Sequence, residues 1–573
     1  MSNTRATVYT AATAKLKRTF VVVALFSAAV NVLMLTGPMF MLQVYDRVLS
    51  SGSVATLQGL FVIVVICYGF LALYDFLRTR LLSRAAYRLD QSVGPQAHAI
   101  WIRSGLSGSS DMSRPLNDLA VVRGFLPSPA MMGIFDTPWI PLYMLVVFIV
   151  HPWLGWLTLA GVCVVAGAAL LNQLTTLEHH SKAMMMDSSE SFFVEQARRN
   201  ADAIVPLGMS ARITQRWEKM HRDGLAVGQT GGDRAEGFTA FSKAFRLLLQ
   251  SSLLGLGGYL ALQQQISAGM IVAASIIAGR ALAPVDQVIG QWRSIVRARD
   301  AHRRLKATFA QQRAHKRTIA LPAPKGQLTV NGVTKFAPGQ IRGGDRPPIL
   351  DAVSFALAPG DAVGVIGPSA SGKSTLARIL VGAWAPDSGE VRLDGATLDQ
   401  WAEDALGDHI GYLPQHLEMM SGSIRDNIAR FDPEADDEKV LAAARLAGVH
   451  EMVLQLPDGY ATELGFGALP LSGGQVQRLG LARAVYGTPR YVVLDEPNSN
   501  LDASGDEALA RAIMSLREAG STVIVMAHRP SAIAAVNKVL VIQQGRVAEF
   551  GDKDDVLSKA TKPRARKPVE TAT

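Results

Sequence analysis

The sequence predicts two unlike halves, an all-α membrane bundle of six helical spans followed by an α/β domain. Three observations carry this prediction: the spacing of the apolar runs, the unequal polar connections between them, and a change of character near Arg293. The chain has 573 residues, of which 49% are hydrophobic and 18% charged, so a disordered chain is excluded. Two cysteines exclude a disulfide framework and a multi-cysteine zinc domain.

Four long apolar runs and two weaker ones fill the first half of the chain. A bilayer core about 30 Å thick requires about 20 helical residues, and the first four runs roughly meet this length. The last two runs contain polar side chains, namely Arg246, Gln250, Arg280 and Asp286. We expect these helices to face the interior of the bundle or to extend beyond the lipid. The alternative is that some runs are core helices of a soluble protein. The six runs cover residues 20–44, 57–77, 134–150, 153–171, 244–262 and 270–289.

The connections between the runs predict the orientation of the chain. Those at 78–130 and 172–243 are long, and a helical hairpin of about 50 residues has arms of roughly 40 Å. Both are rich in Lys and Arg, whereas the short connections carry almost none apart from Arg47. The positive-inside rule therefore predicts that the long arms, both termini and everything after residue 289 are cytoplasmic. The net charge of +9 then reflects topology, and no nucleic acid is needed to explain it.

A phosphate-binding loop is the strongest motif of the second half. From residue 328, short Val- and Ile-rich runs alternate with helical stretches, which indicates an α/β domain. Residues 367–374, GPSASGKS, fit the pattern G-x-x-x-x-G-K-[ST] between a strand-like run and a helical pattern. The glycines let backbone amides and a helix N-terminus surround phosphates. We predict that Lys373 reaches the β- and γ-phosphates of ATP and that Ser374 ligates Mg²⁺.

The second motif is YVVLDEP at 491–497, which is typical of a buried strand that ends in two carboxylates. Asp495 is predicted to hold the Mg²⁺ shell, and Glu496 to polarise an attacking water. The alternative is a strand end with two solvated acids, and the phosphate loop in the same chain argues against it.

Between these two motifs, LSGGQ at 471–475 resembles the signature motif of ABC ATPases. YLPQ with Gln415 resembles the Q-loop of that family, SNLD at 499–502 the D-loop, and MAHRP with His528 the switch histidine. All occur in the order seen in the family. The resemblance implies an α/β P-loop ABC ATPase domain and a head-to-tail dimer, in which the signature motif of one chain covers the ATP of the other.

The resemblance also implies a role for each motif residue. Glu496 and His528 are the expected catalytic residues, and Ser374, Gln415 and Asp495 the expected Mg²⁺ ligands. Phe336 is the candidate for stacking on adenine, with a buried strand phenylalanine as the alternative. Ala370 and Val476 replace a Gly and an Arg common in the family, and neither change removes a chemical group. The expected ATP-binding residues are Gly367, Pro368, Ser369, Ala370, Ser371, Gly372, Lys373, Ser374, Thr375 and Phe336. The signature motif comprises Leu471, Ser472, Gly473, Gly474 and Gln475, and the D-loop Ser499, Asn500, Leu501 and Asp502.

Three further segments resemble one branch of the ABC exporters. NVLMLTGPMFMLQVYDRVLSSGSVATL, FDTPWIPLYMLVVFIVHPWLGW and LDEPNSNLD are similar to the type I secretion permease/ATPases of the protease/RTX exporter kind. A single phosphate loop and a single signature motif imply a half-transporter with a six-helix ABC exporter transmembrane domain. The resemblance implies ATP-driven export of polypeptide across the bacterial inner membrane, with the ATPase domain in the cytoplasm. The implied partners are a second copy of the chain, a periplasmic adaptor (membrane fusion protein), an outer-membrane channel, an unfolded protein substrate with a C-terminal signal, and the lipid bilayer.

We expect five segments and keep two other functions open. The segments are a cytoplasmic N-terminal stretch (1–19), a six-span transmembrane domain with cytoplasmic helical extensions (20–292), a linker (293–327), the nucleotide-binding domain (328–556) and a basic disordered tail (557–573). A lipid or drug exporter of the same architecture is one alternative function, and a soluble nucleic-acid-associated ATPase is the other. Asp46 and Arg47, after the first run, would contact the adaptor, close an exit gate or form a plain surface pair.

Overall fold

The computed structural model describes residues 7–106, 114–311, 321–337, 347–465, 471–527 and 530–560. The chain divides into two compact units. The first comprises Met1–Trp101 and Met112–Arg313, and the second Ile102–Asp111 and Ala314–Thr573. His528 and the part of the expected tail beyond Ala560 lie outside the described residues.

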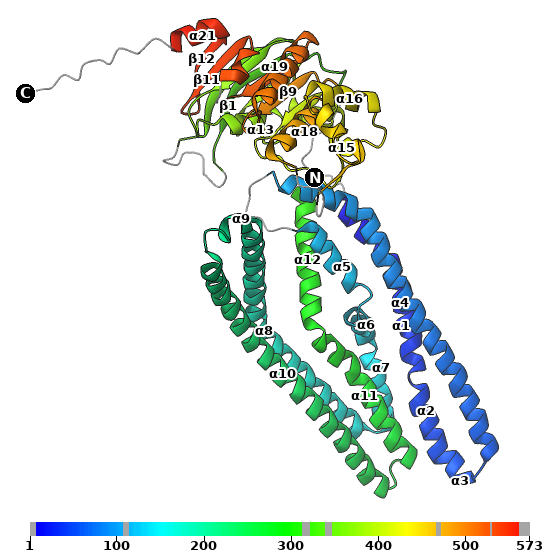
Figure 1. The fold of residues 1–573 in the computed structure, drawn as a ribbon. Coiled ribbons are helices and arrows are strands. Elements are labelled where there is room, and N and C mark those ends of the chain that lie inside the picture. The colour runs from blue at the N-terminus through cyan, green and yellow to red at the C-terminus, as the bar shows by residue number, and fades with distance from the viewer. Residues whose placement is uncertain are drawn as a thin grey trace, which may run out of the picture. The chain divides into compact units, whose positions relative to one another are not determined.

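The first unit is entirely helical over its described residues (Figure 1). Its elements are α1 (Val8–Leu33), α2 (Thr36–Gln43), the π-helical turn η1 (Val44–Val48), α3 (Leu49–Ser51), α4 (Val54–Ser104), α5 (Pro115–Phe125), α6 (Pro129–Asp136), η2 (Thr137–Trp139), α7 (Ile140–Val150), α8 (Pro152–Arg199), α9 (Ala201–Ile204), α10 (Ser210–Leu262), α11 (Ala268–Gly290) and α12 (Trp292–Gln311). In the part of the chain that the structure describes, six stretches are long and apolar enough to cross a membrane, and they overlap the six predicted runs: Val8–Ser51, Val54–Ser104, Pro129–Val150, Pro152–Asn172, Ser210–Leu262 and Ala268–Gly290. The predicted fold class of this half is confirmed.

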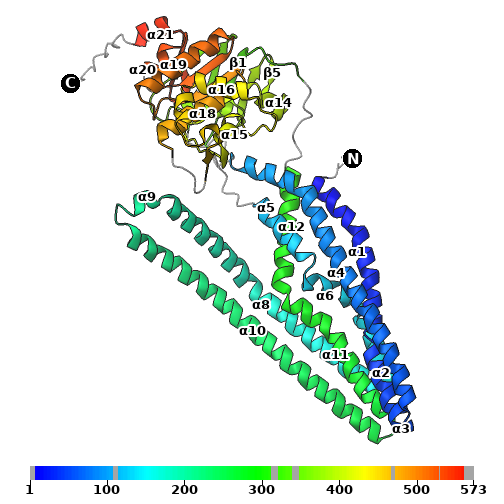
Figure 2. The same cartoon turned by 45° about the vertical axis from the view of Figure 1, so that its right-hand side comes forward.

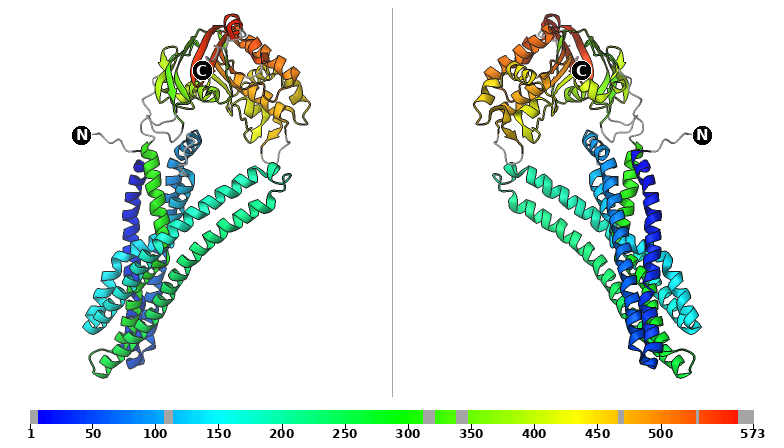
Figure 3. Two further views of the ribbon diagram at one scale, coloured as in Figure 1. Left: turned by 90° about the vertical axis from the view of Figure 1, so that its left-hand side faces the viewer. Right: turned by 90° about the vertical axis from the view of Figure 1, so that its right-hand side faces the viewer.

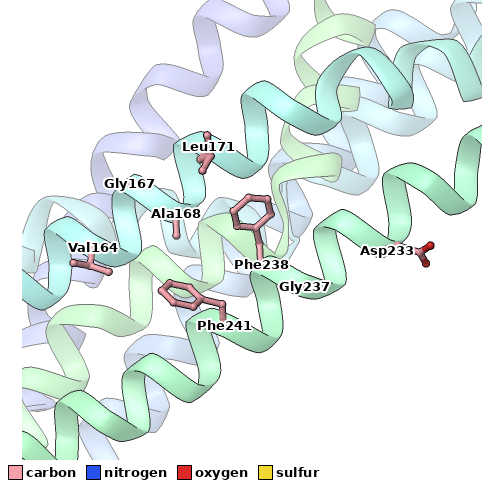
Figure 4. A pocket seen from close by; sticks show the side chains of 8 residues that line it. All are labelled: Val164, Gly167, Ala168, Leu171, Asp233, Gly237, Phe238 and Phe241. Atoms are coloured by element: carbon pink, nitrogen blue, oxygen red, sulfur yellow. The ribbon is translucent and has the colours of Figure 1, made fainter.

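The helices α8 and α10 form the longest hairpin of the first unit. They have 48 and 53 residues, which correspond to roughly 70–80 Å at 1.5 Å per residue, far more than a bilayer core requires. They run side by side and are joined through the short helix α9 (Figure 2). Between them lies a cavity of about 530 Å³, where Gly167 and Gly237 leave room that larger side chains would fill (Figure 4). Its other lining residues are Val164, Ala168, Leu171, Asp233, Phe238 and Phe241.

A network of buried polar side chains joins three of the spans. Arg78 on α4 is 5% exposed, and its Nη1 donates to Asp136 Oδ1 at 2.8 Å and to Ser27 Oγ at 3.0 Å. Asn31 on α1 donates from Nδ2 to the same Asp136 oxygen at 2.8 Å, and it accepts from the Tyr143 hydroxyl at 2.9 Å. Charged groups within a membrane bundle are costly unless paired. This network therefore fixes α1, α4, α6 and α7 against one another.

The polar residues of the last two spans differ in their contacts and exposure. Asp286 accepts hydrogen bonds from Arg246 at 3.2 Å and from Ser242 at 3.1 Å, so α10 and α11 are joined by an ion pair. Arg280 and Gln250 are exposed in the single chain. Arg246 is exposed as well, and Asp286 is half-buried. That these helices face the interior of the bundle or extend beyond the lipid stays a prediction.

Two contacts join the first elements of the unit to its last two helices. The Tyr9 hydroxyl lies 2.6 Å from His302 Nδ1, and α1 and α12 lie side by side (Figure 3). In the turn η1, the Asp46 carboxylate accepts from the Gly269 N–H at 3.0 Å and from the Ser267 hydroxyl, at the start of α11. Asp46 therefore does more than form a surface pair with Arg47, because its carboxylate caps the N-terminus of α11, which is distant in the sequence.

The second unit is an α/β fold with two principal sheets, which confirms the predicted fold class. The parallel sheet has the order β12-β11-β3-β10-β9-β6, with β12 antiparallel at one edge, and the antiparallel sheet has the order β2-β1-β4-β5. The strands are β1 (Leu328–Lys335), β2 (Leu350–Leu357), β3 (Ala362–Ile366), β4 (Ser388–Leu393), β5 (Ala396–Thr397), β6 (Ile410–Leu413), β7 (Gly422–Ser423), β8 (Glu463–Leu464), β9 (Tyr491–Asp495), β10 (Thr522–Met526), β11 (Lys538–Gln543) and β12 (Arg546–Asp552).

Helices of the second unit cover both faces of the parallel sheet, on one face together with the antiparallel sheet. They are α13 (Lys373–Leu380), η4 (Leu398–Gln400), α14 (Glu403–Gly407), α15 (Ile424–Ile428), α16 (Asp437–Leu446), α17 (His450–Leu454), η5 (Gly459–Ala461), α18 (Gly473–Val485), α19 (Ala503–Glu518), α20 (Pro530–Ala534) and α21 (Lys553–Ala560). The central strands are fully buried, and alternate residues enter two separate cores, as expected for a sheet covered on both faces. The helix α21 continues to Ala560, four residues into the expected tail at 557–573.

Candidate active site

The phosphate-binding loop joins the central strand β3 to α13. A Cβ atom on Gly367 would lie 2.2 Å from the carbonyl oxygen of Ile542, so only glycine fits at the start of the loop. Gly372 ends the loop with φ +99° and forms the N-cap of α13, a left-handed conformation that glycine adopts without strain. These two glycines turn the chain sharply from strand to helix at the carboxyl edge of the sheet, where α/β folds bind ligands.

Ala370 occupies a conformation that the sequence does not reveal. Its φ is +62°, in the left-handed region, where a Cβ atom costs about 1–2 kcal/mol. The replacement of the common glycine removes no chemical group, as expected, but it strains the backbone of the loop.

Lys373, the first residue of α13, is held inside the loop. Its side chain is 6% exposed, and Nζ donates to the carbonyl oxygens of Gly367 at 2.8 Å and Pro368 at 2.9 Å. Burial lowers the pKa of Lys373, and the nearby carboxylates of Glu496 and Asp495 oppose this shift. The loop thus presents an ammonium group and backbone amides together, which suits a polyphosphate.

The carboxylates at the end of β9 lie close to this loop. Ser374 Oγ donates to Asp495 Oδ1 at 3.3 Å, which joins two motifs 121 residues apart. Asp495 is 2% exposed, and burial raises its pKa, against the hydrogen bond from Ser374. A carboxylate beside a hydroxyl is the oxygen-donor pair that Mg²⁺ uses when phosphates and waters complete its shell. Among the described residues, no group of three or more His, Cys, Asp or Glu side chains is arranged so that it could hold a metal ion.

Glu496 follows Asp495 and turns the chain out of the sheet. Its φ is +52°, and its N–H donates to the Met526 carbonyl at 3.1 Å. A non-glycine residue in this region is strained, and such residues cluster at functional sites. As a result, the two consecutive carboxylates lie in different environments. Asp495 is buried beside Ser374, and Glu496 is half-buried.

The other predicted residues of the ATP site are distributed around this edge. Gln415 is exposed and follows β6, which pairs in parallel with β9, so Gln415 lies at the same edge of the sheet as Asp495. Phe336 directly follows β1, is half-buried, and donates its N–H to Asp387 at 2.8 Å. It is thus not a buried strand phenylalanine, and its stacking on adenine stays a prediction. His528 lies outside the described residues.

The signature motif forms the N-terminus of α18. Leu471 packs partly against a core, whereas Ser472 and Gly473 are exposed. The Ser472 hydroxyl accepts from the Gln475 N–H at 3.3 Å, and Gln475 Oε1 accepts from the Ser472 N–H at 2.8 Å, which is a capping box. The motif thus combines a buried anchor with an exposed helix end.

The D-loop lies directly against the signature helix of the same chain. A Cβ atom on Gly474 would lie 2.8 Å from the Asn500 carbonyl oxygen. Asp502 caps α19 through the Gly505 N–H at 2.9 Å, and it forms an ion pair with Arg478 at 2.8 Å. Arg478 and its neighbour Gln477, which is buried although polar, were not predicted from the sequence. The only signal was their position directly after the signature motif.

Comparisons with known proteins agree with this architecture. The model of the ABC transporter family matches residues 350–499. The type I secretion system ATP-binding protein PrsD of Rhizobium meliloti is 42% identical over 95% of this chain and 93% of its own length. The cyclolysin secretion/processing ATP-binding protein CyaB of Bordetella pertussis is 30% identical over 94% of this chain and 75% of its own length.

A more distant relative and a solved structure extend the comparison. The alpha-hemolysin translocation ATP-binding protein HlyB of Escherichia coli is 26% identical over 95% of this chain and 77% of its own length. The structure of a bacterial Atm1-family ABC exporter with ATP bound has the same fold. Its TM-score is 0.77 at 22% identity, over 96% of this chain and 97% of that chain. The similarity to PrsD includes the membrane half as well as the ATPase, and this multi-pass chain with its ATPase unit therefore belongs to the type I secretion permease/ATPase family of ABC exporters.

Proposed function

We propose that this protein uses ATP hydrolysis to export polypeptides across the bacterial inner membrane, as the ABC component of a type I secretion system. One observation carries the proposal: the similarity to a type I secretion protein covers 95% of this chain and so continues through the membrane half. The six spans and the ATP site occur in one chain, which supplies the pathway and the energy source together.

The chemistry proposed for the ATP site assigns one role to each of the motif residues. The residues at 367–375 would bind the phosphates, with Lys373 and the α13 amides nearest to the negative charge. Ser374, Asp495 and Gln415 would hold Mg²⁺, whose chemistry is to neutralise charge on the β- and γ-phosphates. Glu496 would polarise the attacking water, and His528 would contact the γ-phosphate.

A complete transporter in this proposal is a homodimer. The exposed Ser472 and Gly473 at the start of α18 would close over the ATP of the second copy. The D-loop at 499–502 would lie in the same interface. The ATPase domain, proposed to cover 328–556, would face the cytoplasm. A periplasmic adaptor and an outer-membrane channel would carry an unfolded substrate with a C-terminal signal to the exterior.

The test is ATPase activity and transport in reconstituted membranes. Purified transporter in liposomes is given unfolded C-terminal segments of secreted proteins from the same bacterium, and in parallel a fluorescent phospholipid. We expect ATP turnover to rise severalfold with a polypeptide segment and the lipid to stay in its leaflet. Lipid movement without any response to polypeptide would instead establish the alternative, a lipid exporter of the same architecture.

A further inference from the structure

Gln477 contacts the segment that links Glu496 to the D-loop. It follows the signature motif on α18 and is 8% exposed. Its Nε2 lies 2.6 Å from the Pro497 carbonyl oxygen, 3.1 Å from that of Glu496 and 3.2 Å from Ser499 Oγ. Its Oε1 accepts from the Asn500 N–H at 2.9 Å. A single carboxamide therefore holds the chain from 496 to 500.

The geometry of this segment explains why such an anchor is needed. Glu496 has a positive φ, and a non-glycine residue keeps this conformation only where surrounding contacts determine it. On one side, β10 provides the Met526 carbonyl as acceptor for the Glu496 N–H. On the other side, Gln477 donates to the carbonyls of Glu496 and Pro497. A carboxamide side chain both donates and accepts in one plane, which matches this pattern of contacts.

The same helix holds the far end of the segment. Arg478 pairs with Asp502 at 2.8 Å, and the Asn500 carbonyl approaches Gly474 so closely that no Cβ atom fits between them. The start of α18 and the chain from Glu496 to Asp502 are therefore connected at three successive places.

We propose that Gln477 is a positioning residue for ATP hydrolysis. It keeps the Glu496 backbone and the D-loop in register with the signature helix, so that Glu496 faces the ATP of its own chain when the signature motif closes over the ATP of the second copy. The assignment of the signature motif to the second copy rests on the proposed function. In this role Gln477 acts through its hydrogen bonds to the Glu496 and Pro497 carbonyls and takes no part in the chemistry itself.

The decisive variant is Gln477→Glu, which keeps the size of the side chain but turns its two N–H donors into an acceptor. The full-length transporter is purified in detergent and assayed for steady-state ATP turnover without polypeptide, and for binding of a fluorescent ATP analogue. A small misplacement of a catalytic group costs on the order of 100-fold in rate, so we expect kcat to fall about 10- to 100-fold. Affinity for the analogue should stay within about threefold, because Lys373 contacts Gly367 and Pro368 independently of Gln477.

The matched control is Asn537→Leu. Asn537 is also an amide that holds backbone: it accepts from the Ala362 N–H at 2.7 Å and donates to Asp361 at 2.9 Å, but at the amino end of β3. We expect this variant to lower the melting temperature and to leave kcat within about twofold, because it lies at the opposite edge of the sheet. A wild-type kcat in Gln477→Glu would overturn the proposal, as would a loss of ATP binding in proportion to kcat. The assay contains no polypeptide, so its outcome is independent of what is exported.

Discussion

The two units of this protein use buried polar side chains in different ways. In the membrane unit, Arg78, Asp136 and Asn31 bond mainly to other side chains, on helices that already satisfy their own backbone. In the ATPase unit, Lys373 and Gln477 bond mainly to backbone carbonyls, because the loops at the edge of the sheet leave those groups unpaired. Replacing one of these side chains in the membrane unit should therefore leave a buried charge without its partner. Replacing one in the ATPase unit should remove the hydrogen bonds that hold a loop in place.

The largest expected effect comes from the chemistry of the ATPase unit. Glu496→Gln removes the group proposed to polarise water but leaves its backbone and the ATP-binding loop intact. We expect phosphate release to fall by about 10²- to 10⁴-fold while ATP binding persists, so that the ATP-bound dimer accumulates. The control is Glu518→Gln, an exposed residue at the end of α19. Wild-type turnover in Glu496→Gln would contradict its catalytic role.

The sharpest test of the membrane unit compares two carboxylates that contact the same arginine. Asp136 and Asp75 each lie 2.8 Å from Arg78, but their side chains are 11% and 52% exposed. Asp136→Ala leaves the guanidinium buried without its main partner and should cost about 3–5 kcal/mol of stability. Asp75→Ala should cost less than about 1 kcal/mol, because a solvated ion pair contributes little.

Chemical unfolding in detergent measures both variants. Replacing Arg78 and Asp136 together by leucine should recover much of the loss, since no charge is then stranded. Equal losses from Asp136→Ala and Asp75→Ala would show that the buried network does not hold the bundle together.

In the ATPase unit, the closest counterpart of Asp136 is Asp361, which accepts hydrogen bonds both from side chains and from a backbone N–H. Burial raises its pKa, but hydrogen bonds from Lys538, Asn537 and the Ala358 N–H outweigh this, and the net pKa is lowered. A lowered carboxyl pKa stabilises the folded state above the unfolded pKa of about 3.9, and this contribution is lost as pH falls through the folded pKa. Asp361→Asn should cost about 1.5–3 kcal/mol at pH 7.

The difference between wild type and Asp361→Asn should shrink as the pH is lowered below about 4. Denaturant unfolding of the full-length chain at several pH values measures this. A difference that stays constant down to pH 2 would mean that the charge of Asp361 contributes nothing.

The smallest expected effect is a gain in stability within the phosphate-binding loop. Ala370→Gly relieves the left-handed alanine at the cost of a more flexible unfolded chain, so we expect a net gain of about 0.5–1 kcal/mol. Gly372→Ala is the reversed control, because its φ is +99° and its Cβ atom would lie 2.7 Å from Leu350 Cδ2. Thermal unfolding should move the two variants in opposite directions, and the same direction for both would refute the strain argument.

The features predicted from the sequence are those encoded by neighbouring residues. The six spans follow from apolar runs of sufficient length, and the turn at Gly367 and Gly372 from a local motif. Contacts between distant residues were not predictable: Asp46 with Ser267, Arg78 with Asp136, and Gln477 with Pro497. Single-sequence patterns carry no information on which helices become neighbours.

The contacts of Tyr9 and Asp46 have a consequence for how the membrane unit could be rebuilt. Its first helix contacts α12 at one end, and the turn that follows α2 contacts α11 at the other, so the chain of this unit closes on itself. A gene opened at the exposed turn at Gly52, where φ is +64°, would produce two fragments that still share both contacts. Because both contacts join the part of the chain before Gly52 to the part after it, we expect the two fragments to reassemble through them.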